Sequence, residues 1–312
     1  MNPTDLALAL LANTAWAFNF IAGKAGVSHF PPLLFSSLRF GMLLLLLFPF
    51  LRWIPGQMKS VITLGFVLGI FHFGLIFLGL EAAGDVSSVA IVAQLYVPFS
   101  ALLAVVFLGE KLGWRRILGI SCAFSGVLVI GFDPLVFQHL DALFFTTAAA
   151  LVMAIATVMM RRLQGVPVFT LQAWIAVIAA PGMLVLTLLL ESGQVQALET
   201  ADWLNFAAPA YSAVGASMVG HGIVYYLLGR YPVSVTAPLM LLTPVLAVFF
   251  GVVFWGDTLT WKLLLGGLLT ITGVAVITIR APQQALVVPD EAKEDDGRSI
   301  PIGPEECSET ER

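Results

Sequence analysis

The chain has 312 residues, of which 59% are hydrophobic and 11% are charged, and its formal net charge is −4. Soluble domains carry roughly 45–50% apolar and about 25% charged residues, so this chain has too little polar surface to cover a water-soluble core. The composition excludes a soluble globular protein and predicts an integral membrane protein. The lack of a basic patch outside the expected inner loops argues against nucleic acid as a partner.

Apolar runs of about 17–24 residues recur along the sequence, each long enough to cross a hydrocarbon layer of about 30 Å as a helix. We predict ten spans, at 5–25, 32–52, 60–80, 86–108, 115–131, 140–160, 168–190, 205–228, 232–254 and 261–280. The first ten residues contain no Lys or Arg, so we expect the first run to remain as a helix rather than to be cleaved as a signal peptide. The predicted fold class is an all-α membrane protein.

One stretch of the sequence occurs twice. Residues 108–130 align without gaps with residues 255–277, at an offset of 147 positions (256 minus 109). The matched pairs include Gly109 with Gly256, Glu110 with Asp257, Trp114 with Trp261, Arg115 with Lys262, Gly119 with Gly266 and Gly126 with Gly273. A repeat of this length predicts two copies of one five-helix unit. We place the first unit at 1–131 and the second at 132–280.

Five spans in each unit is an odd number, so the second unit enters the membrane from the side opposite to the first, which makes the two units inverted repeats. With the N-terminus inside, the Lys and Arg residues at inner loops and ends are Arg52, Lys59, Lys111, Arg115, Arg116, Arg161, Arg162, Arg230 and Arg280, whereas the outer loops carry Lys24 and Lys262. This positive-inside bias predicts a multi-pass membrane protein with both termini in the cytoplasm.

The first two predicted helices carry polar residues within the membrane. Trp16 and Asn19 share a helical face with Asn13 and Gly23, where the amides and the indole either bond to neighbouring helices or face a substrate. Arg39 lies about eight residues, or roughly 12 Å, inside the second helix, which is costly unless the charge is paired or faces a wet cavity. Arg39 either grips a substrate carboxylate, satisfies helix carbonyls or extends to the outer surface.

The third and fourth helices add further candidates. His72 lies near the middle of the third helix and serves either as a packing residue or as a ligand. In the fourth helix, Gln94 lies on one stripe with Pro98, and Tyr96 is beside it. Pro98 and Pro244 interrupt helices in both halves, and paired interruptions indicate a binding site near the membrane midplane.

The eighth helix has Ser217, His221 and Tyr225 at i, i+4 and i+8, a polar stripe that we expect to face the bundle rather than lipid. There it contacts either a substrate or neighbouring helices. The fifth and tenth helices are rich in Gly and β-branched residues with almost nothing polar, and we expect them to be packing elements.

Catalytic signatures are lacking in the sequence. It has no phosphate-binding or dinucleotide-binding glycine motif and no clustered Cys, His and Asp set for a metal. Ser217 and His221 are adjacent on one helix, but no third group orients the histidine. The two cysteines, Cys122 and Cys307, give no disulfide framework. We therefore predict no enzyme activity, no catalytic residues, no metal and no cofactor.

Acidic residues gather outside the predicted spans. Residues 281–312 hold nine acidic and three basic residues, which predicts a disordered cytoplasmic tail. We also expect the acidic residues of the outer loops to be solvated and uninformative about orientation; these are Asp133, Asp141, Glu191, Glu199 and Asp202.

Several stretches resemble the EamA family of the drug/metabolite transporter superfamily. They are WAFNF at 16–20 with Lys24, PPLLFSSLRF at 31–40, VAQLYVPFSALLAVVFLGEKL at 92–112, GVLVI at 126–130 and the doubled GE/GD loop. The resemblance covers about 5–280 and implies a central cavity lined by the first four helices of each half, with the fifth and tenth helices at the periphery. The substrate-binding residues that it implies here are Trp16, Asn19, Arg39, His72, Gln94, Tyr96, His221 and Tyr225. The acidic tail has no counterpart in the family.

The residues and the resemblance together predict an exporter of small amino-acid-like metabolites of the cysteine or O-acetylserine type, working by alternating access. Arg39, or the amides of Asn19 and Gln94, would orient the polar end of the substrate, while Trp16 and Tyr225 would stack on it or contact an ammonium group. The alternatives are a broad-specificity exporter of drugs or cationic compounds and, less favoured, an intramembrane enzyme. Expected partners are the small-molecule substrate and membrane lipids, with a monomer and a dimer both open.

Energy coupling follows from the distribution of carboxylates. No Asp or Glu lies at membrane depth, since Glu81 and Asp85 lie at the outer end of the third helix and Asp5 at the inner edge. This favours facilitated diffusion or exchange, with His72 and His221 as the protonatable alternatives.

Overall fold

The computed structural model describes residues 1–108, 113–163, 165–231, 236 and 239–279. Every regular element in these ranges is helical, and they contain no strand. The predicted all-α fold is therefore confirmed. The acidic tail at 281–312 with Cys307, the loop residues Glu110 and Lys111, and Arg280 lie outside the described residues.

The first half of the chain forms five helical rods. They are α1 (Pro3–Val27); α2 (Pro32–Leu47) with η1 (Phe48–Phe50); α3 (Met58–Leu64), η2 (Gly65–His72) and α4 (Phe73–Ala82); α5 (Val86–Val92), η3 (Ala93–Leu95) and α6 (Tyr96–Leu108); and α7 (Trp114–Gly131). Each of these rods is long and apolar enough to span a membrane.

The second half repeats this order with short additions. It comprises α8 (Pro134–Phe137), α9 (Leu140–Met160), α10 (Val168–Leu190), α11 (Gln194–Glu199), α12 (Trp203–Tyr211), η4 (Ser212–Gly220), α13 (His221–Arg230), α15 (Leu242–Phe250), η5 (Gly251–Trp255) and α16 (Trp261–Ile279). In the described part of the chain eight helices qualify as candidate membrane spans, and Leu242–Trp255 is a shorter apolar helix. The count of ten spans stays a prediction.

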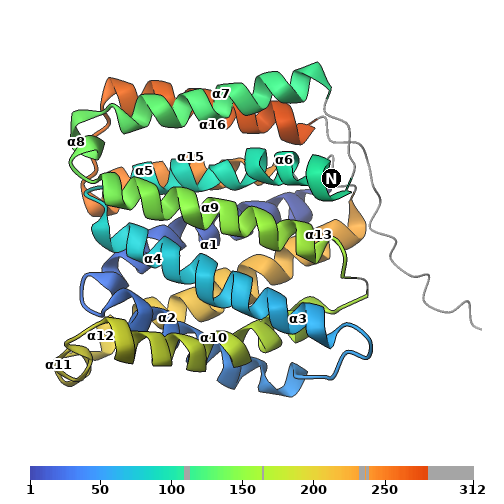
Figure 1. The fold of residues 1–312 in the computed structure, drawn as a ribbon, viewed down its shortest axis with the longest axis vertical. Coiled ribbons are helices and arrows are strands. Elements are labelled where there is room, and N and C mark those ends of the chain that lie inside the picture. The colour runs from blue at the N-terminus through green and yellow to red at the C-terminus, as the bar shows by residue number, and fades with distance from the viewer. Residues whose placement is uncertain (109–112, 164, 232–235, 237–238, 280–312) are drawn as a thin grey trace, which may run out of the picture.

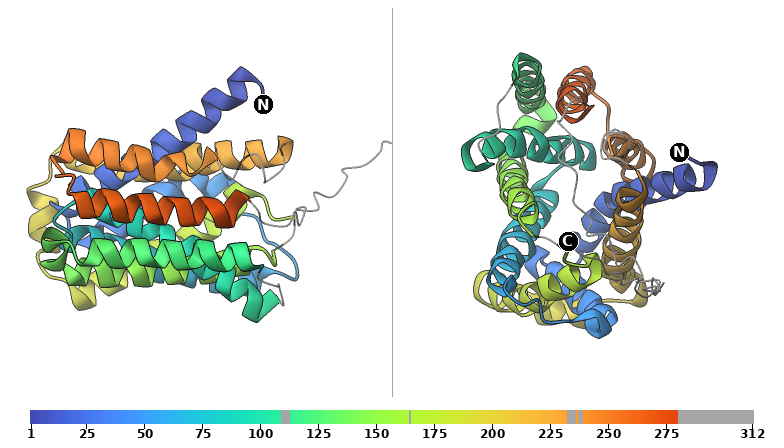
Figure 2. Two further views of the ribbon diagram at one scale, coloured as in Figure 1. Left: turned by 90° about the horizontal axis from the view of Figure 1, so that it is seen from above. Right: turned by 90° about the vertical axis from the view of Figure 1, so that its right-hand side faces the viewer.

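The rods lie side by side, and α7 and α16 pack together at one edge of the bundle (Figure 1). Seen along the rods, the other helices surround a central region, and the N-terminal part of α1 projects away from the bundle (Figure 2). Large apolar side chains are strongly exposed on the described helices, including Leu45, Val106 and Leu189 at 74% or more. A surface of this kind suits contact with lipid rather than water.

The contact between α7 and α16 is two-fold symmetric. A methyl group at Gly126 would lie 2.5 Å from the carbonyl oxygen of Gly266, and one at Gly119 would lie 2.9 Å from that of Gly273. Cys122 Sγ donates to the carbonyl of Leu269, its equivalent 147 positions later. Because Gly119 meets Gly273 and Gly126 meets Gly266, the two equivalent helices run antiparallel, as inverted repeats require.

A π-helical segment occurs at the same place in each repeat, between α3 and α4 in the first half and between α12 and α13 in the second. These segments are η2, which begins at Gly65, and η4, which begins at Ser212, and the two residues are separated by the repeat offset (212 minus 65 is 147). A π-helix widens the turn, so carbonyl groups pair with donors five residues on, and such segments often occur at functional sites. No pattern in the sequence predicts them.

Two of the carboxylates predicted for outer loops contradict the expectation that these acids are simply solvated. Asp133 is buried and accepts from the backbone N–H of Leu135 and the hydroxyl of Thr260. Glu191 accepts from the backbone N–H groups of Leu33 and Leu34 at 2.8 and 3.2 Å. Both carboxylates satisfy N–H groups at the starts of helices, which otherwise have no partner within the helix.

Candidate substrate-binding site

Arg39 is the most unusual residue of the described bundle. Its side chain is only 2% exposed, and its Nη2 donates to Ser217 Oγ at 3.0 Å. Its Nε and Nη1 atoms have no hydrogen-bond acceptor. Among the described residues, no carboxylate forms an ion pair with Arg39. A buried guanidinium with two unpaired nitrogens is costly, and an anion would remove much of that cost.

Three phenylalanine rings surround the Arg39 guanidinium. Its central carbon lies 4.1 Å from the ring centroid of Phe73, 5.1 Å from that of Phe40 and 5.6 Å from that of Phe77. The faces of aromatic rings attract cations but do not replace a counter-ion. The rings therefore surround the charge with apolar groups, while Nε and Nη1 have no acceptor.

The π-helical segment η4 receives contacts from α2 and α10. Arg39 on α2 reaches Ser217, whose own hydroxyl lies 3.2 Å from the carbonyl of Ser212, five residues earlier. From α10, Gln172 donates to the carbonyl of Ser217 at 2.9 Å. Because the π turn redirects these carbonyls, side chains of α2 and α10 converge on one short segment.

The first helix is bound to the same segment. Trp16 Nε1 donates to the carbonyl of Ala216 at 3.0 Å, and Ser212 Oγ donates to Asn19 Oδ1 at 2.7 Å. Two of the predicted site residues, Trp16 and Asn19, thus contact η4, the segment to which Arg39 also donates. Ser212 was not among the predicted residues, because a π-helix leaves no periodic signal in the sequence.

His221 and Tyr225 follow η4 on α13. His221 Nδ1 lies 3.0 Å from the carbonyl of Ala216, again five residues earlier, and its ring meets the Trp16 ring edge-on with centroids 5.2 Å apart. Tyr225 is 54% exposed, whereas Ser217 is 2% exposed. The predicted stripe is therefore not continuous, because the π segment breaks the i, i+4 spacing on which it was based.

His72 ends the other π segment, η2. Its Nδ1 lies 2.9 Å from the carbonyl of Ala149, and its ring is 4.8 Å from that of Phe73, which also covers Arg39. His72 is therefore one aromatic ring away from the guanidinium.

Gln94 and Tyr96 lie in another part of the bundle. Both are half-buried, Gln94 on η3 and Tyr96 at the start of α6. Tyr96 packs against a cluster that includes Leu95, Val127 and Leu263, on the side of the bundle where α7 and α16 lie. The structure gives neither residue a contact with Arg39.

Within the described part of the chain, cavities of about 280 and about 10 Å³ lie at the loops that precede α5, α9 and α16. Neither is lined by any of the eight predicted residues.

At the opposite end of the rods, the Asp5 carboxylate accepts from Tyr231 OH at 2.7 Å and lies 3.8 Å from Arg230. This contact ties the start of α1 to the end of α13.

The fold defines a multi-pass, all-helical membrane protein whose helices α7 and α16 are related by inversion. The model of the EamA-like transporter family matches it twice, over residues 4–132 and 141–279. The chain therefore belongs to the EamA-like transporter family, as the sequence resemblance had indicated.

Relatives of known name are transport proteins. The chain is 32% identical to a protein of Salmonella typhimurium named probable amino-acid metabolite efflux pump, over 88% of this chain and 95% of that protein. A protein of the same name in Escherichia coli K12 is 30% identical over the same shares of the two chains. A solved crystal structure aligns with a TM-score of 0.59 at 20% identity, over 89% of this chain and 98% of that one, which shows the shared fold alone.

Proposed function

We propose that the protein exports small amino-acid-like metabolites by alternating access, and that Arg39 binds the substrate carboxylate. The observation that carries this proposal is the buried guanidinium with unpaired Nε and Nη1 and no carboxylate partner among the described residues. A carboxylate is the complementary ligand, because its two oxygens match the planar N–H groups of a guanidinium. The names of the two relatives, amino-acid metabolite efflux pumps, support the same substrate class.

The surrounding groups suit the remainder of an amino acid. In this role Trp16 and His221 would border the substrate side chain, and Asn19 would bond to its polar atoms. Gln94, Tyr96, His72 and Tyr225 complete the proposed set and would reach the substrate in other conformations of the transport cycle. For residues as far apart as Arg39 and Tyr96 to share a substrate, the rods must move relative to one another.

Exchange of conformations needs contacts that can break at each end of the rods. Asp5 with Tyr231 is such a contact at one end, and Glu191 with Leu33 is one at the other. We propose that the protein lies in the cell inner membrane. The end of the bundle with Asp5 would face the cytoplasm, together with both chain termini. The distribution of Lys and Arg over the loops supports this orientation.

Counterflow in proteoliposomes tests the function. We expect radiolabelled cysteine or O-acetylserine to accumulate in vesicles preloaded with the same compound, and cationic dyes not to do so, since the uncompensated charge of Arg39 repels cations. Arg39→Ala should abolish counterflow, whereas Arg52→Ala, at an exposed position after η1, should not. Transport of bulky cations that is unaffected by Arg39→Ala would instead support the drug exporter, and product formation in detergent would support an enzyme.

A further inference from the structure

The larger cavity is an acidic vestibule. It has a volume of about 280 Å³ and is lined by Asp85, Asp133 and Asp257, together with His139 and Trp255. These residues come from three separate loops at the end of the rods that the positive-inside bias places outside. With three carboxylates and no Lys or Arg in its lining, this cavity attracts cations.

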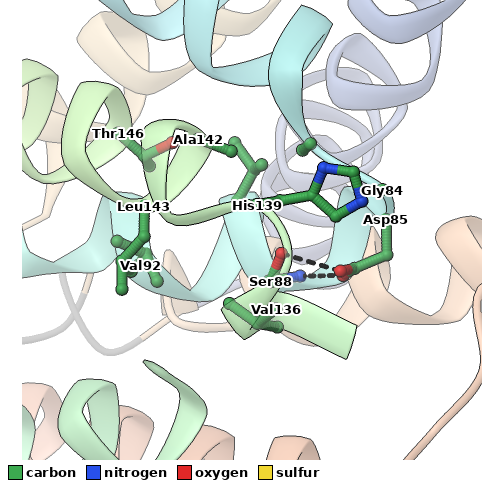
Figure 3. Close-up of a pocket in the computed structure, with 11 residues that line it drawn as sticks. Gly84, Asp85, Ser88, Val92, Val136, His139, Ala142, Leu143 and Thr146 are labelled. Atoms are coloured by element: carbon green, nitrogen blue, oxygen red, sulfur yellow. Dashed lines mark hydrogen bonds between the residues drawn. The ribbon is translucent and has the colours of Figure 1, made fainter. Parts of the chain in front are cut away.

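The smaller cavity, of about 10 Å³, is lined in part by the same residues and extends along the start of α9. It has the volume of about one water molecule. Asp85 and His139 border both cavities, and Figure 3 shows them beside Ser88 and Thr146. Thr146 is 1% exposed, and its hydroxyl has no hydrogen-bond partner. A buried hydroxyl without a partner indicates that a water molecule or another polar ligand occupies this space.

The three carboxylates differ in the hydrogen-bond donors that hold them. Asp257 accepts from the backbone N–H of Val86 and from both the N–H and the hydroxyl of Ser87, the latter at 2.6 Å. Asp133 is held between Leu135 and Thr260 and borders only the larger cavity. The donors to Asp85 come from one residue, Ser88, at 2.6 Å from the N–H and 3.0 Å from the hydroxyl.

From this geometry, and in place of the facilitated diffusion or exchange that the sequence favours, we propose that Asp85 is a proton-binding site, reached from the outer side through the vestibule, and that its protonation is coupled to export. A proton from outer water binds one Oδ of Asp85 and makes the carboxylate a neutral acid, which relieves its repulsion with Asp257 and Asp133. The water-sized space beside Thr146 and His139 gives this proton a hydrogen-bonded path to the carboxylate. The site itself rests on geometry, whereas its coupling rests on the proposed export function.

The charged neighbours of Asp85 favour uptake of a proton. Burial raises the pKa of the Asp85 carboxyl above its ordinary value, the two donors of Ser88 oppose this, and the charges of Asp257 and Asp133 add to it. On the other sides, Lys24 of α1 donates to the carbonyls that end α4, Glu81 is exposed, and His139 precedes α9. Among the described residues, the groups able to change charge around Asp85 are thus Asp257, Asp133, His139, Lys24 and Glu81.

Protonation also has a structural consequence. Asp85 caps the first turn of α5 and follows the end of α4, so it lies at the joint between the third and fourth rods. An uncharged acid is a weaker acceptor for the Ser88 N–H than a carboxylate is. Binding of a proton would therefore loosen this joint at the outer end, where a substrate must leave.

Infrared difference spectroscopy of the purified protein tests the site without any substrate. We expect a carboxylic acid band that appears on acidification at a pH above the ordinary aspartate range of about 4 and is lost in Asp85→Asn. Asn retains the helix cap but does not titrate. Glu81→Gln, at the exposed carboxylate one turn earlier, should leave the band in place. A band that persists in Asp85→Asn, or no such band in the wild type, would overturn the proposal.

Counterflow at varied external pH tests the coupling. The wild type should depend on pH with a slope of up to about tenfold per unit, as one proton requires, and Asp85→Asn should lose this dependence. Ser88→Ala removes one donor from the carboxylate, so the midpoint should move to higher pH. An unchanged midpoint, or a pH dependence that survives Asp85→Asn, would refute the coupling. If the infrared band is found but no amino acid is transported, the proposed function fails and the proton site stands.

Discussion

Gly126 and Gly266 meet across the contact of α7 with α16, so closely that a methyl group at Gly126 would lie 2.5 Å from the carbonyl oxygen of Gly266. The equivalent pair, Gly119 with Gly273, meets in the same way. This contact is where the two halves of the chain show their inversion most plainly, because each helix packs on its own counterpart. Small residues permit such close approach of helix backbones in a membrane.

We expect Gly126→Ala to destabilise the protein. The added methyl group would force the backbones of α7 and α16 apart, at a cost of about 1–3 kcal/mol. Gly41→Ala is the matched control, because Gly41 is also helical and a methyl group there would meet nothing within 4 Å. Thermal unfolding in detergent should separate the two variants, and equal melting temperatures would contradict the packing described here.

Ser217→Ala should weaken substrate binding without unfolding the protein. Ser217 is the side chain to which Arg39 donates, and loss of a hydrogen bond to a charged group costs about 1.5–3 kcal/mol, or roughly tenfold or more in affinity. Ser36→Ala is the control on the same helix as Arg39, since its buried hydroxyl has no partner to lose. Counterflow KM values provide the measurement, and an equal change in both variants would argue against a positioning role for Ser217.

Asp257→Ala should loosen the end of the bundle at which α5 begins. The carboxylate of Asp257 belongs to the second half of the chain but satisfies Val86 and Ser87 at the start of α5 in the first. Its loss leaves two N–H groups without an acceptor, at about 1–3 kcal/mol. Asp141→Ala, at an exposed carboxylate, should stay within about 0.5 kcal/mol of the wild type in the same unfolding assay. If Asp257→Ala unfolds with the same stability as the wild type, water replaces the carboxylate at little cost.

The free energy of unfolding should depend on pH through the protonation of Asp85. Because burial raises its pKa in the native state, the folded protein binds this proton more tightly than the unfolded chain does. The resulting contribution to the free energy of unfolding is present below the unfolded pKa and is lost as pH rises through the native pKa. As the pH rises through the native pKa of Asp85, the Asp85→Asn variant should therefore gain stability relative to the wild type. Melting temperatures measured across a pH series would show this difference, and parallel curves would exclude it.

The sequence was sufficient to predict the membrane fold, the repeat and the position of Arg39 inside a membrane-spanning helix. Composition and helix-length runs report directly on the lipid environment, and a charge inside an apolar run is visible without a structure. The convergence of Arg39, Trp16 and Asn19 on η4 was not predictable in detail. It depends on a π-helical turn at Ser212 that arises from packing rather than from any local residue pattern.

The loop carboxylates show a different limit of the sequence. An acidic residue in a loop is usually solvated, and nothing beside Asp257 or Glu191 in the sequence indicates that each caps a helix from a distant rod. Such contacts appear only when the rods are placed side by side. The vestibule around Asp85 escaped prediction for the same reason, since its lining comes from three loops separated by about fifty to more than a hundred residues in the sequence.

The role of Arg39 is tested most directly by comparing an amino acid with its methyl ester, which has the same shape but no carboxylate charge. In counterflow inhibition, the wild type should prefer the free acid by about tenfold or more, as the loss of a charge-assisted bidentate pair implies. Arg39→Gln should bind the two compounds equally. If Arg39→Gln keeps the full preference for the free acid, the guanidinium does not recognise the carboxylate and the proposed site is wrong.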